Sequence, residues 1–165
     1  MKFRILSQTE QELYNADVMA IVDYTDVSAL GASTTGTLNV CPATTAGLMP
    51  ALGTSGTDTI PANFTAALVV ALVDTAFVSS TATGLTMTVG DSGSNNRFLT
   101  SSQLQSGQTP IAGVTGSLAG NEYYYAAATA INAYFTSTTA NLSTFTAGSM
   151  RLFFSVQDMG QLAKA

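Results

Sequence analysis

Short stretches in which apolar and polar residues alternate, separated by turns, constrain the fold of this chain more than any other feature. From residue 85 to 89, the apolar side chains of Leu85, Met87 and Val89 alternate with the hydroxyls of Thr86 and Thr88. Successive side chains of a strand point to opposite faces, so this pattern is typical of a half-buried strand. About seven or eight such stretches, with no long amphipathic helix between them, predict an all-β, antiparallel β-sandwich of jelly-roll type.

The expected strands are bounded by residues that favour turns, mainly Gly, Ser, Thr and Asn. They cover residues 16–24, 37–41, 64–77, 85–89, 123–125, 130–136 and 150–157. Residues 98–104 are compatible with a strand or one helical turn, and residues 46–52 with one helical turn. The stretch at 64–77 begins apolar on both faces, which predicts a central strand covered on each side.

A shift in composition predicts two parts in the chain. Charged residues are concentrated before residue 31, which separates an N-terminal segment, 1–35, from a sandwich domain, 36–165. Within the segment, a short helix in residues 8–19, capped by Ser7 or Thr9, is expected to precede a strand. The composition leaves open whether this segment is an attachment arm or part of the sandwich.

The composition also limits the classes of partner. Hydrophobic residues make up 46% of the chain and charged residues only 9%, where a charged fraction of about 25% is usual. Such a neutral, hydroxyl-rich surface suits packing against other proteins. The five basic residues form no stripe in the sequence, so nucleic-acid binding is not expected. The longest apolar run, residues 64–73, is shorter than the roughly 20 residues that span a bilayer, so no membrane insertion is expected.

Candidate catalytic motifs in the chain are incomplete. Gly90-Asp91-Ser92-Gly93 matches the surroundings of the nucleophile in trypsin-like proteases, but the chain has no histidine to accept the serine proton. We therefore expect a turn and no enzymatic activity. Asp91, Gly93 and Asn95 are spaced like the first ligands of a calcium loop, yet no glutamate completes the set, and neither a metal nor another cofactor is expected. The single cysteine, Cys41, is expected to be buried, with a reactive thiol as the alternative.

Residues 58–157 resemble small structural proteins of tailed bacteriophages. The resemblance is carried by five features: Ile60-Pro61-Ala62-Asn63, an apolar strand ending in Thr75-Ala76-Phe77, a strand followed by Gly90-Asp91, Arg97-Phe98-Leu99-Thr100, and the stretch from Leu142 to Phe154. Proteins of this kind decorate or cement the capsid exterior or lie elsewhere in the virion. The resemblance implies a β-sandwich, self-assembly or attachment to a capsid lattice, and no enzymatic activity.

The expected function is therefore that of a virion protein, made in the host cytoplasm, that binds the capsid exterior and stabilises the shell. Its expected partners are the major capsid protein or another virion protein, and copies of itself, with a trimer favoured. Four residues are candidates for these contacts: Phe153, Arg151, Arg97 and Tyr124. The alternative function is a receptor- or carbohydrate-binding module of a phage head or tail fibre.

The candidate contact residues each have a second interpretation. Phe153 lies on the polar face of the last strand, where it suits a contact between subunits, and a second covered face within the domain explains it equally well. Arg97 is expected to pair with Asp91, to contact a neighbouring subunit, or to be a solvated charge. The run Tyr123 to Tyr125 suggests a sugar-binding platform, but core packing with only Tyr124 exposed is favoured.

Overall fold

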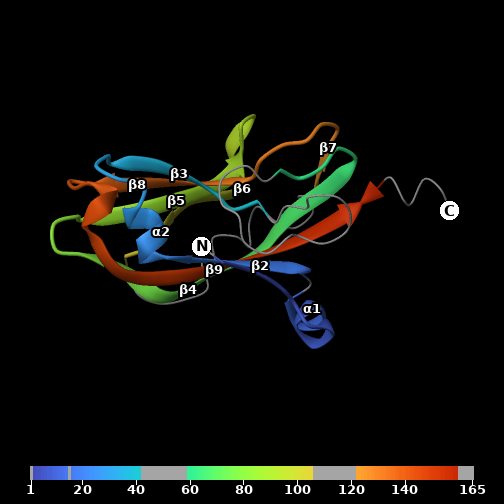
Figure 1. Cartoon of the computed structure of the whole chain (residues 1–165), viewed down its shortest axis with the longest axis horizontal. Helices are drawn as coiled ribbons and strands as arrows, with labels where there is room; N and C mark the ends of the chain where they lie inside the picture. Colours follow the sequence, from blue (N-terminus) through green and yellow to red (C-terminus); the bar gives the residue numbers. More distant parts are fainter. Residues whose placement is uncertain (1, 15, 42–58, 106–121, 160–165) are drawn as a thin grey trace.

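The computed structural model describes residues 2–14, 16–41, 59–105 and 122–159, which form two antiparallel sheets packed face to face (Figure 1). The five-stranded sheet contains, in spatial order, β1 (Lys2–Ile5), β2 (Val18–Asp23), β9 (Phe145–Asp158), β4 (Phe64–Ser79) and β7 (Tyr123–Tyr125). The four-stranded sheet contains β3 (Thr35–Asn39), β8 (Asn132–Thr138), β5 (Gly84–Asp91) and β6 (Ser94–Gln103). The predicted all-β, antiparallel sandwich is confirmed.

The strands pair in a nested order. The antiparallel ladders β2·β9, β3·β8, β4·β7 and β5·β6 lie one inside another along the sequence, and the ladders β4·β9 and β5·β8 join them within the sheets. From β2 to β9 the chain is thus one long hairpin centred on the turn between β5 and β6. This long hairpin is folded over so that its successive pairs alternate between the two sheets.

The N-terminal segment is part of the sandwich. Strand β2 pairs with β9 from Val18 opposite Phe154 to Asp23 opposite Ser149, and β1 extends the sheet beyond β2. The expected boundary at residue 35 therefore does not separate a free arm from the domain, because the segment supplies two strands of the five-stranded sheet. The composition left open whether the segment is an attachment arm or part of the sandwich. Pairing of β2 with β9, more than 120 residues later in the sequence, makes it part of the sheet, and local composition does not predict such distant pairing.

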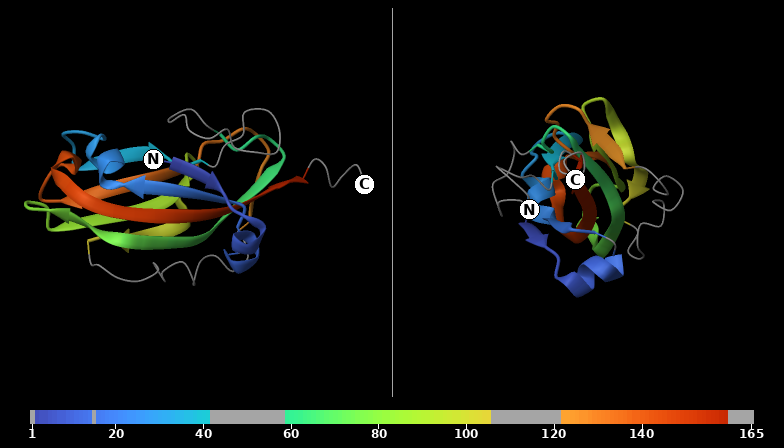
Figure 2. Two further views of the ribbon diagram at one scale, coloured as in Figure 1. Left: turned by 60° about the horizontal axis from the view of Figure 1, so that its bottom comes forward. Right: turned by 90° about the vertical axis from the view of Figure 1, so that its right-hand side faces the viewer.

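The helices are short. Helix α1 (Gln8–Tyr14) lies outside the two layers (Figure 2), and α2 (Tyr24–Ser28) and the 3-10 helix Leu142–Thr144 lie at strand ends. At the start of α1 the Ser7 hydroxyl accepts the Glu10 amide at 3.4 Å, while the Glu10 carboxylate accepts the Ser7 amide at 3.0 Å. A short helix was predicted within residues 8–19; this reciprocal cap places its start at Ser7, one of the two capping residues considered, and the helix ends at Tyr14. No helix in the described ranges is both long and apolar enough to cross a membrane.

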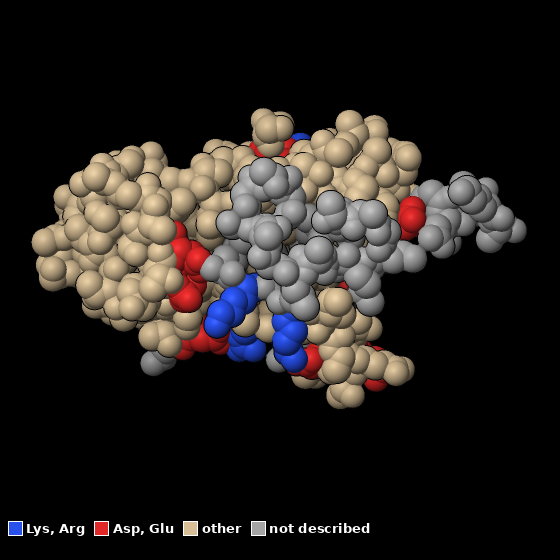
Figure 3. Space-filling view, viewed as in Figure 1, with Lys and Arg blue, Asp and Glu red and all other residues tan. Residues whose placement is uncertain are grey.

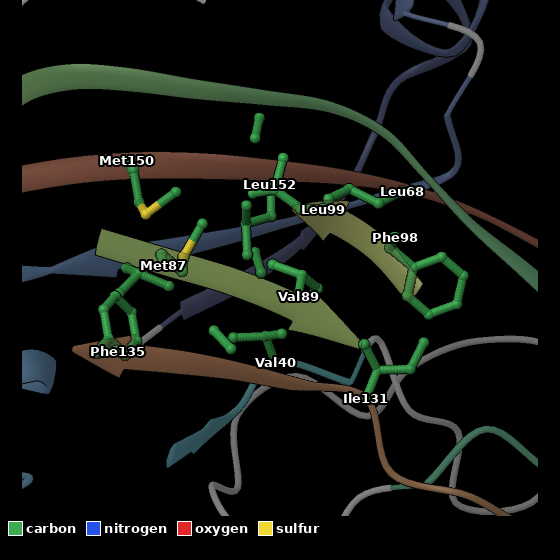
Figure 4. Close-up of a cluster of buried hydrophobic side chains, with 14 of the residues drawn as sticks. Val40, Leu68, Met87, Val89, Phe98, Leu99, Ile131, Phe135, Met150 and Leu152 are labelled. Atoms are coloured by element: carbon green, nitrogen blue, oxygen red, sulfur yellow. The ribbon is translucent and has the colours of Figure 1, made fainter. Parts of the chain in front are cut away.

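The core lies between the two sheets (Figure 4). Leu85, Met87 and Val89 are fully buried on one face of β5, as their alternation predicts, and they meet Met150 and Leu152 of β9. Cys41 is buried at the edge of the same core, as expected. Burying such side chains removes apolar surface from water, which is the main stabilising contribution to folding.

Strand β4 changes face within its apolar run. Leu68 is opposite Phe154 and Val70 is opposite Phe153, so Val69 is an extra residue in the ladder. Because this bulge shifts the alternation, Leu68 and Ala71 both face the core while Val70 and Leu72 face outward. The predicted central strand, apolar on both faces, is confirmed, but its outward face is only half-buried, so the expectation that it is covered on each side is wrong for that face.

A helical turn was considered for two segments of the chain, residues 98–104 and residues 46–52. Residues 98–104 belong mainly to strand β6, so the helical turn considered there is wrong. The helical turn considered for residues 46–52 lies outside the described residues.

The motif Gly90-Asp91-Ser92-Gly93 forms the turn between β5 and β6. A Cβ atom on Gly90 would lie 2.0 Å from the carbonyl oxygen of Ser94, so only glycine allows the two strands to approach so closely. The Asp91 carboxylate accepts the amides of Gly93 at 2.8 Å and Ser94 at 3.0 Å, which stabilises the turn. The close approach of the strands at Gly90 and the hydrogen bonds of Asp91 therefore account for these two residues of the motif as parts of a turn.

We expect Gly90→Ala to lower the free energy of unfolding by about 3 kcal/mol or more, because the new methyl group must displace backbone. Urea unfolding followed by circular dichroism measures this loss. Gly84→Ala in the same strand is the matched control, since its Cβ would meet only side-chain atoms, 3.2 Å from Thr138 Oγ1 and 3.3 Å from Gln103 Nε2. Equal losses in the two variants would contradict the steric explanation.

Candidate functional site

The structure separates the four candidate contact residues into two regions. Phe153 and Arg151 lie on the outer face of the five-stranded sheet, and Arg97 and Tyr124 lie near its far edge, beside β7. The first region is mainly apolar, and the second combines tyrosine rings with charged side chains.

Phe153 is not exposed. Its side chain is 1% accessible and belongs to a second apolar cluster with Leu6, Ala16 and Met19, on the face of the sheet opposite the core. The expected exposed contact at Phe153 is therefore wrong, and the alternative of a second covered face is confirmed. Leu6 and Ala16 flank helix α1, so the chain segment around this helix covers the phenyl ring.

Four further apolar side chains on this outer face are only half-buried. They adjoin the Phe153 cluster, and we call them the outer apolar strip: Ile21, Val69, Val70 and Leu72. Its residues belong to β2 and β4, the two strands that pair with β9 on either side.

One ion pair interrupts the outer apolar strip and another lies on β1 and α1. Arg151 lies between Ile21 and Leu72 in the sheet register, and its Nε is 3.0 and 2.9 Å from the two carboxylate oxygens of Asp74. Arg4 forms a further ion pair with Glu10. On the face seen in Figure 3, basic and acidic side chains lie next to each other, and most of the described surface is uncharged.

The second region is built around the Asp91 carboxylate, which is 3% exposed. It accepts Arg97 Nε at 2.5 Å and the hydroxyl of Tyr125 at 2.9 Å, besides the two turn amides. The predicted pairing of Arg97 with Asp91 is confirmed. Since Tyr125 belongs to β7 of the other sheet, this carboxylate links the two layers at one end of the sandwich.

The hydrogen bonds determine the protonation of this cluster. Burial raises the pKa of Asp91, but the hydrogen bonds from Arg97, Tyr125 and the two amides outweigh burial, so its pKa lies below the ordinary value. Burial and the adjacent carboxylate raise the pKa of Tyr125 far above its ordinary value. The hydrogen bond to Asp91 raises the pKa of Arg97. The cluster thus contains one carboxylate, one guanidinium and a neutral phenol.

Tyr123 is held against this cluster from two sides. The Arg97 guanidinium carbon lies 3.7 Å from the centre of the Tyr123 ring, and the ring of Tyr125 meets it edge-on with centroids 4.9 Å apart. Tyr123 is 39% exposed and Tyr124 49% exposed, while Tyr125 is buried. The expectation that only Tyr124 is exposed is therefore wrong.

Two pockets open on either side of the contact between Arg97 and Tyr123. The Glu122 pocket has a volume of about 280 Å³ and is lined by Ser94, Asn96, Arg97, Glu122 and Tyr123. The Tyr124 pocket has a volume of about 260 Å³ and includes Ser92, Arg97 and the three consecutive tyrosines. Both pockets share Arg97 and Tyr123, which form a ridge between them.

The chemistry available in these pockets is hydrogen bonding and aromatic contact. The described residues contain no group of three or more His, Cys, Asp or Glu side chains that could hold a metal ion. Each pocket contains a serine and a carboxylate, Ser94 with Glu122 in one and Ser92 with Asp91 in the other, and the chain has no histidine to activate either serine as in a Ser-His-Asp triad. The hydroxyl, carboxylate and aromatic groups of these pockets are suited to binding a polar ligand.

The contacts of Tyr123 and Tyr125 could not be found from the sequence. Tyr125 and Asp91 are 34 residues apart, and nothing in the local pattern of either predicts their hydrogen bond. The isolated base Arg97 next to an Asp-containing turn was a signal for its pairing, because the two residues face each other across a tight hairpin.

Comparison with known proteins adds no further constraint on function. No family model, curated protein or solved structure matches the chain.

We expect Asp91→Asn to lower the free energy of unfolding at pH 7 by about 3 kcal/mol, because it leaves a partly buried guanidinium without its carboxylate. The lowered pKa of Asp91 stabilises the fold above about pH 4, and this contribution is lost as the pH falls through the folded-state pKa. The difference between wild type and variant should therefore narrow from pH 6 to pH 2 in urea titrations.

Asp74→Asn is the matched control for this measurement. Its carboxylate also binds an arginine, but both side chains of the pair are 34% exposed, so solvent screens the interaction and a loss within about 1 kcal/mol is expected. A constant difference between wild type and Asp91→Asn across the acidic range would contradict the assignment of Asp91 as the stabilising carboxylate.

Proposed function

We propose that this chain is a non-enzymatic virion protein that binds the exterior of a tailed-phage capsid and stabilises the shell through protein–protein contact. The single observation that carries the proposal is the outer apolar strip on the five-stranded sheet. The strip offers apolar surface on a rigid layer, away from the core that the fold itself requires.

The composition of the strip and its surroundings supports a protein partner. The centre of a protein interface is depleted in charge and rich in apolar side chains, and its rim is polar with frequent arginine. Here the half-buried Ile21, Val70 and Leu72 supply the apolar side chains, and Arg151 lies between Ile21 and Leu72 in the sheet register. Because Arg151 is already paired with Asp74, a partner can cover this face without supplying a charge.

The topology supports the virion assignment at the level of the fold. The nested ladders, with strand orders β2-β9-β4-β7 and β3-β8-β5-β6, are those expected of a jelly roll, in which eight strands wrap as two Greek keys. Jelly rolls occur in viral capsid proteins and in lectins. The fold by itself does not define a function, but it agrees with the resemblance of residues 58–157 to phage structural proteins.

Attachment at many equivalent sites would convert a modest contact into a stable one. A capsid repeats the same surface, so an oligomeric decoration protein can bind two or three copies at once. After its first contact has formed, the next contact forms at a high effective concentration. In this mechanism the strip holds adjacent capsid subunits together, and a trimer is the oligomer that we propose.

We expect Leu72→Asp to weaken self-association and binding to phage capsids stripped of this protein by at least tenfold, because it puts a charge into the outer apolar strip. Sedimentation velocity measures the oligomer, and pelleting with capsids measures occupancy. Val78→Asp is the control, since Val78 lies on the same strand, is 50% exposed and is outside the strip. A wild-type chain that stays monomeric and leaves the capsids bare would contradict the proposal.

A further inference from the structure

We propose that the ridge formed by Arg97 and Tyr123 is a binding site for a neutral oligosaccharide, with one sugar unit in each of the two flanking pockets. This site lies on a different region from the outer apolar strip and goes beyond the proposed role in assembly. The rigidity of the ridge, its charge, the polar groups around it and the size of the pockets support this site.

The ridge is rigid before any ligand arrives. The Tyr123 ring is fixed by the guanidinium of Arg97 at 3.7 Å and by the edge-on contact with Tyr125. Arg97 is itself fixed by the buried Asp91 carboxylate. Binding to a site that is already ordered costs little conformational entropy, which matters for a ligand that makes few contacts.

Tyr123 remains accessible despite these contacts. The residue is 39% exposed and lines both pockets. An aromatic ring with one accessible part can contact the apolar C–H surface of a sugar while neighbouring polar groups bind the hydroxyls.

The charge of the site favours a neutral ligand over an anionic one. The positive charge of Arg97 is matched by Asp91 at 2.5 Å, so the ridge carries no net cationic charge. The exposed Glu122 adds a negative charge to one pocket. A phosphate, sulfate or sialic acid would meet this carboxylate without an unpaired cation in return, which disfavours binding.

The polar groups of the Glu122 pocket complement sugar hydroxyls. The Ser94 hydroxyl donates to Asn96 Oδ1 at 3.0 Å, which leaves the side-chain NH₂ of Asn96 as a donor. The Glu122 carboxylate supplies acceptors. Hydroxyl groups both donate and accept hydrogen bonds, so this mixture suits a polyhydroxylated ligand.

The size of the site also favours sugar units. Each pocket is just below the roughly 300 Å³ at which sites for drug-sized ligands begin, with volumes of about 280 and 260 Å³. Two small pockets on either side of a shared ridge fit a chain of small rings better than one large cofactor.

A printed array of neutral and anionic glycans tests the inference, followed by calorimetric titration with the best neutral glycan. We expect neutral glycans to bind and Tyr123→Ala to weaken binding at least tenfold, whereas Tyr123→Phe, which keeps the ring, retains most of the affinity. Tyr24→Ala is the control, because Tyr24 is similarly exposed at 37% and lies on α2, away from the ridge (Figure 1). Thermal unfolding confirms that each variant is folded.

The outcomes separate this inference from the proposed role in assembly. Glycan binding that persists in Leu72→Asp, while capsid binding is lost, supports two independent sites. No binding to any neutral glycan, binding of anionic glycans alone, or unchanged affinity in a folded Tyr123→Ala variant would overturn the inference. The inference can fail on any of these results while capsid binding by the wild-type chain stands.

Discussion

The buried carboxylate of Asp91 is the interaction on which one whole end of the molecule depends. A charge out of contact with water is stable only when hydrogen bonds replace its solvation. Asp91 obtains them from two turn amides, Arg97 and Tyr125, and its carbonyl oxygen also accepts the Tyr134 hydroxyl at 3.2 Å. These donors come from both sheets, so satisfying one charge fixes the turn, the edge strand β7 and the ridge together.

Strand β9 organises the rest of the molecule by presenting two covered faces. Met150, Leu152 and Phe154 enter the core between the sheets, while Phe153 enters the second cluster on the outside. The second cluster is completed by the segment around α1, which covers Phe153 and leaves the outer apolar strip half-buried beside it. A single strand therefore connects the stability of the fold to the surface that we propose for assembly.

Local patterns in the sequence predicted the elements whose environment is determined by near neighbours. The alternation of Leu85, Met87 and Val89 predicted the correct buried face of β5, because a strand with one polar face and one apolar face is stable only with its apolar face toward the core. The turn at Asp91 was predicted for a similar reason, and the helix cap was narrowed to Ser7 or Thr9, since the partners of these groups lie within six residues. The sequence left two interpretations of Phe153 open, and the distant segment around α1 decides that it is covered. Tyr123 was expected in the core but is partly exposed, packed against Arg97 and Tyr125.

By itself the sequence determined that this protein is an antiparallel β-sandwich with few charges, because residue periodicity and turn chemistry act over a few residues and need no tertiary information. Only the tertiary structure decided that the N-terminal segment joins the sheet, that Phe153 is covered, and that Arg97 and Tyr123 form a ridge between two pockets. These features depend on strand order and register between segments far apart in the chain, and no local pattern encodes which distant strand becomes a neighbour.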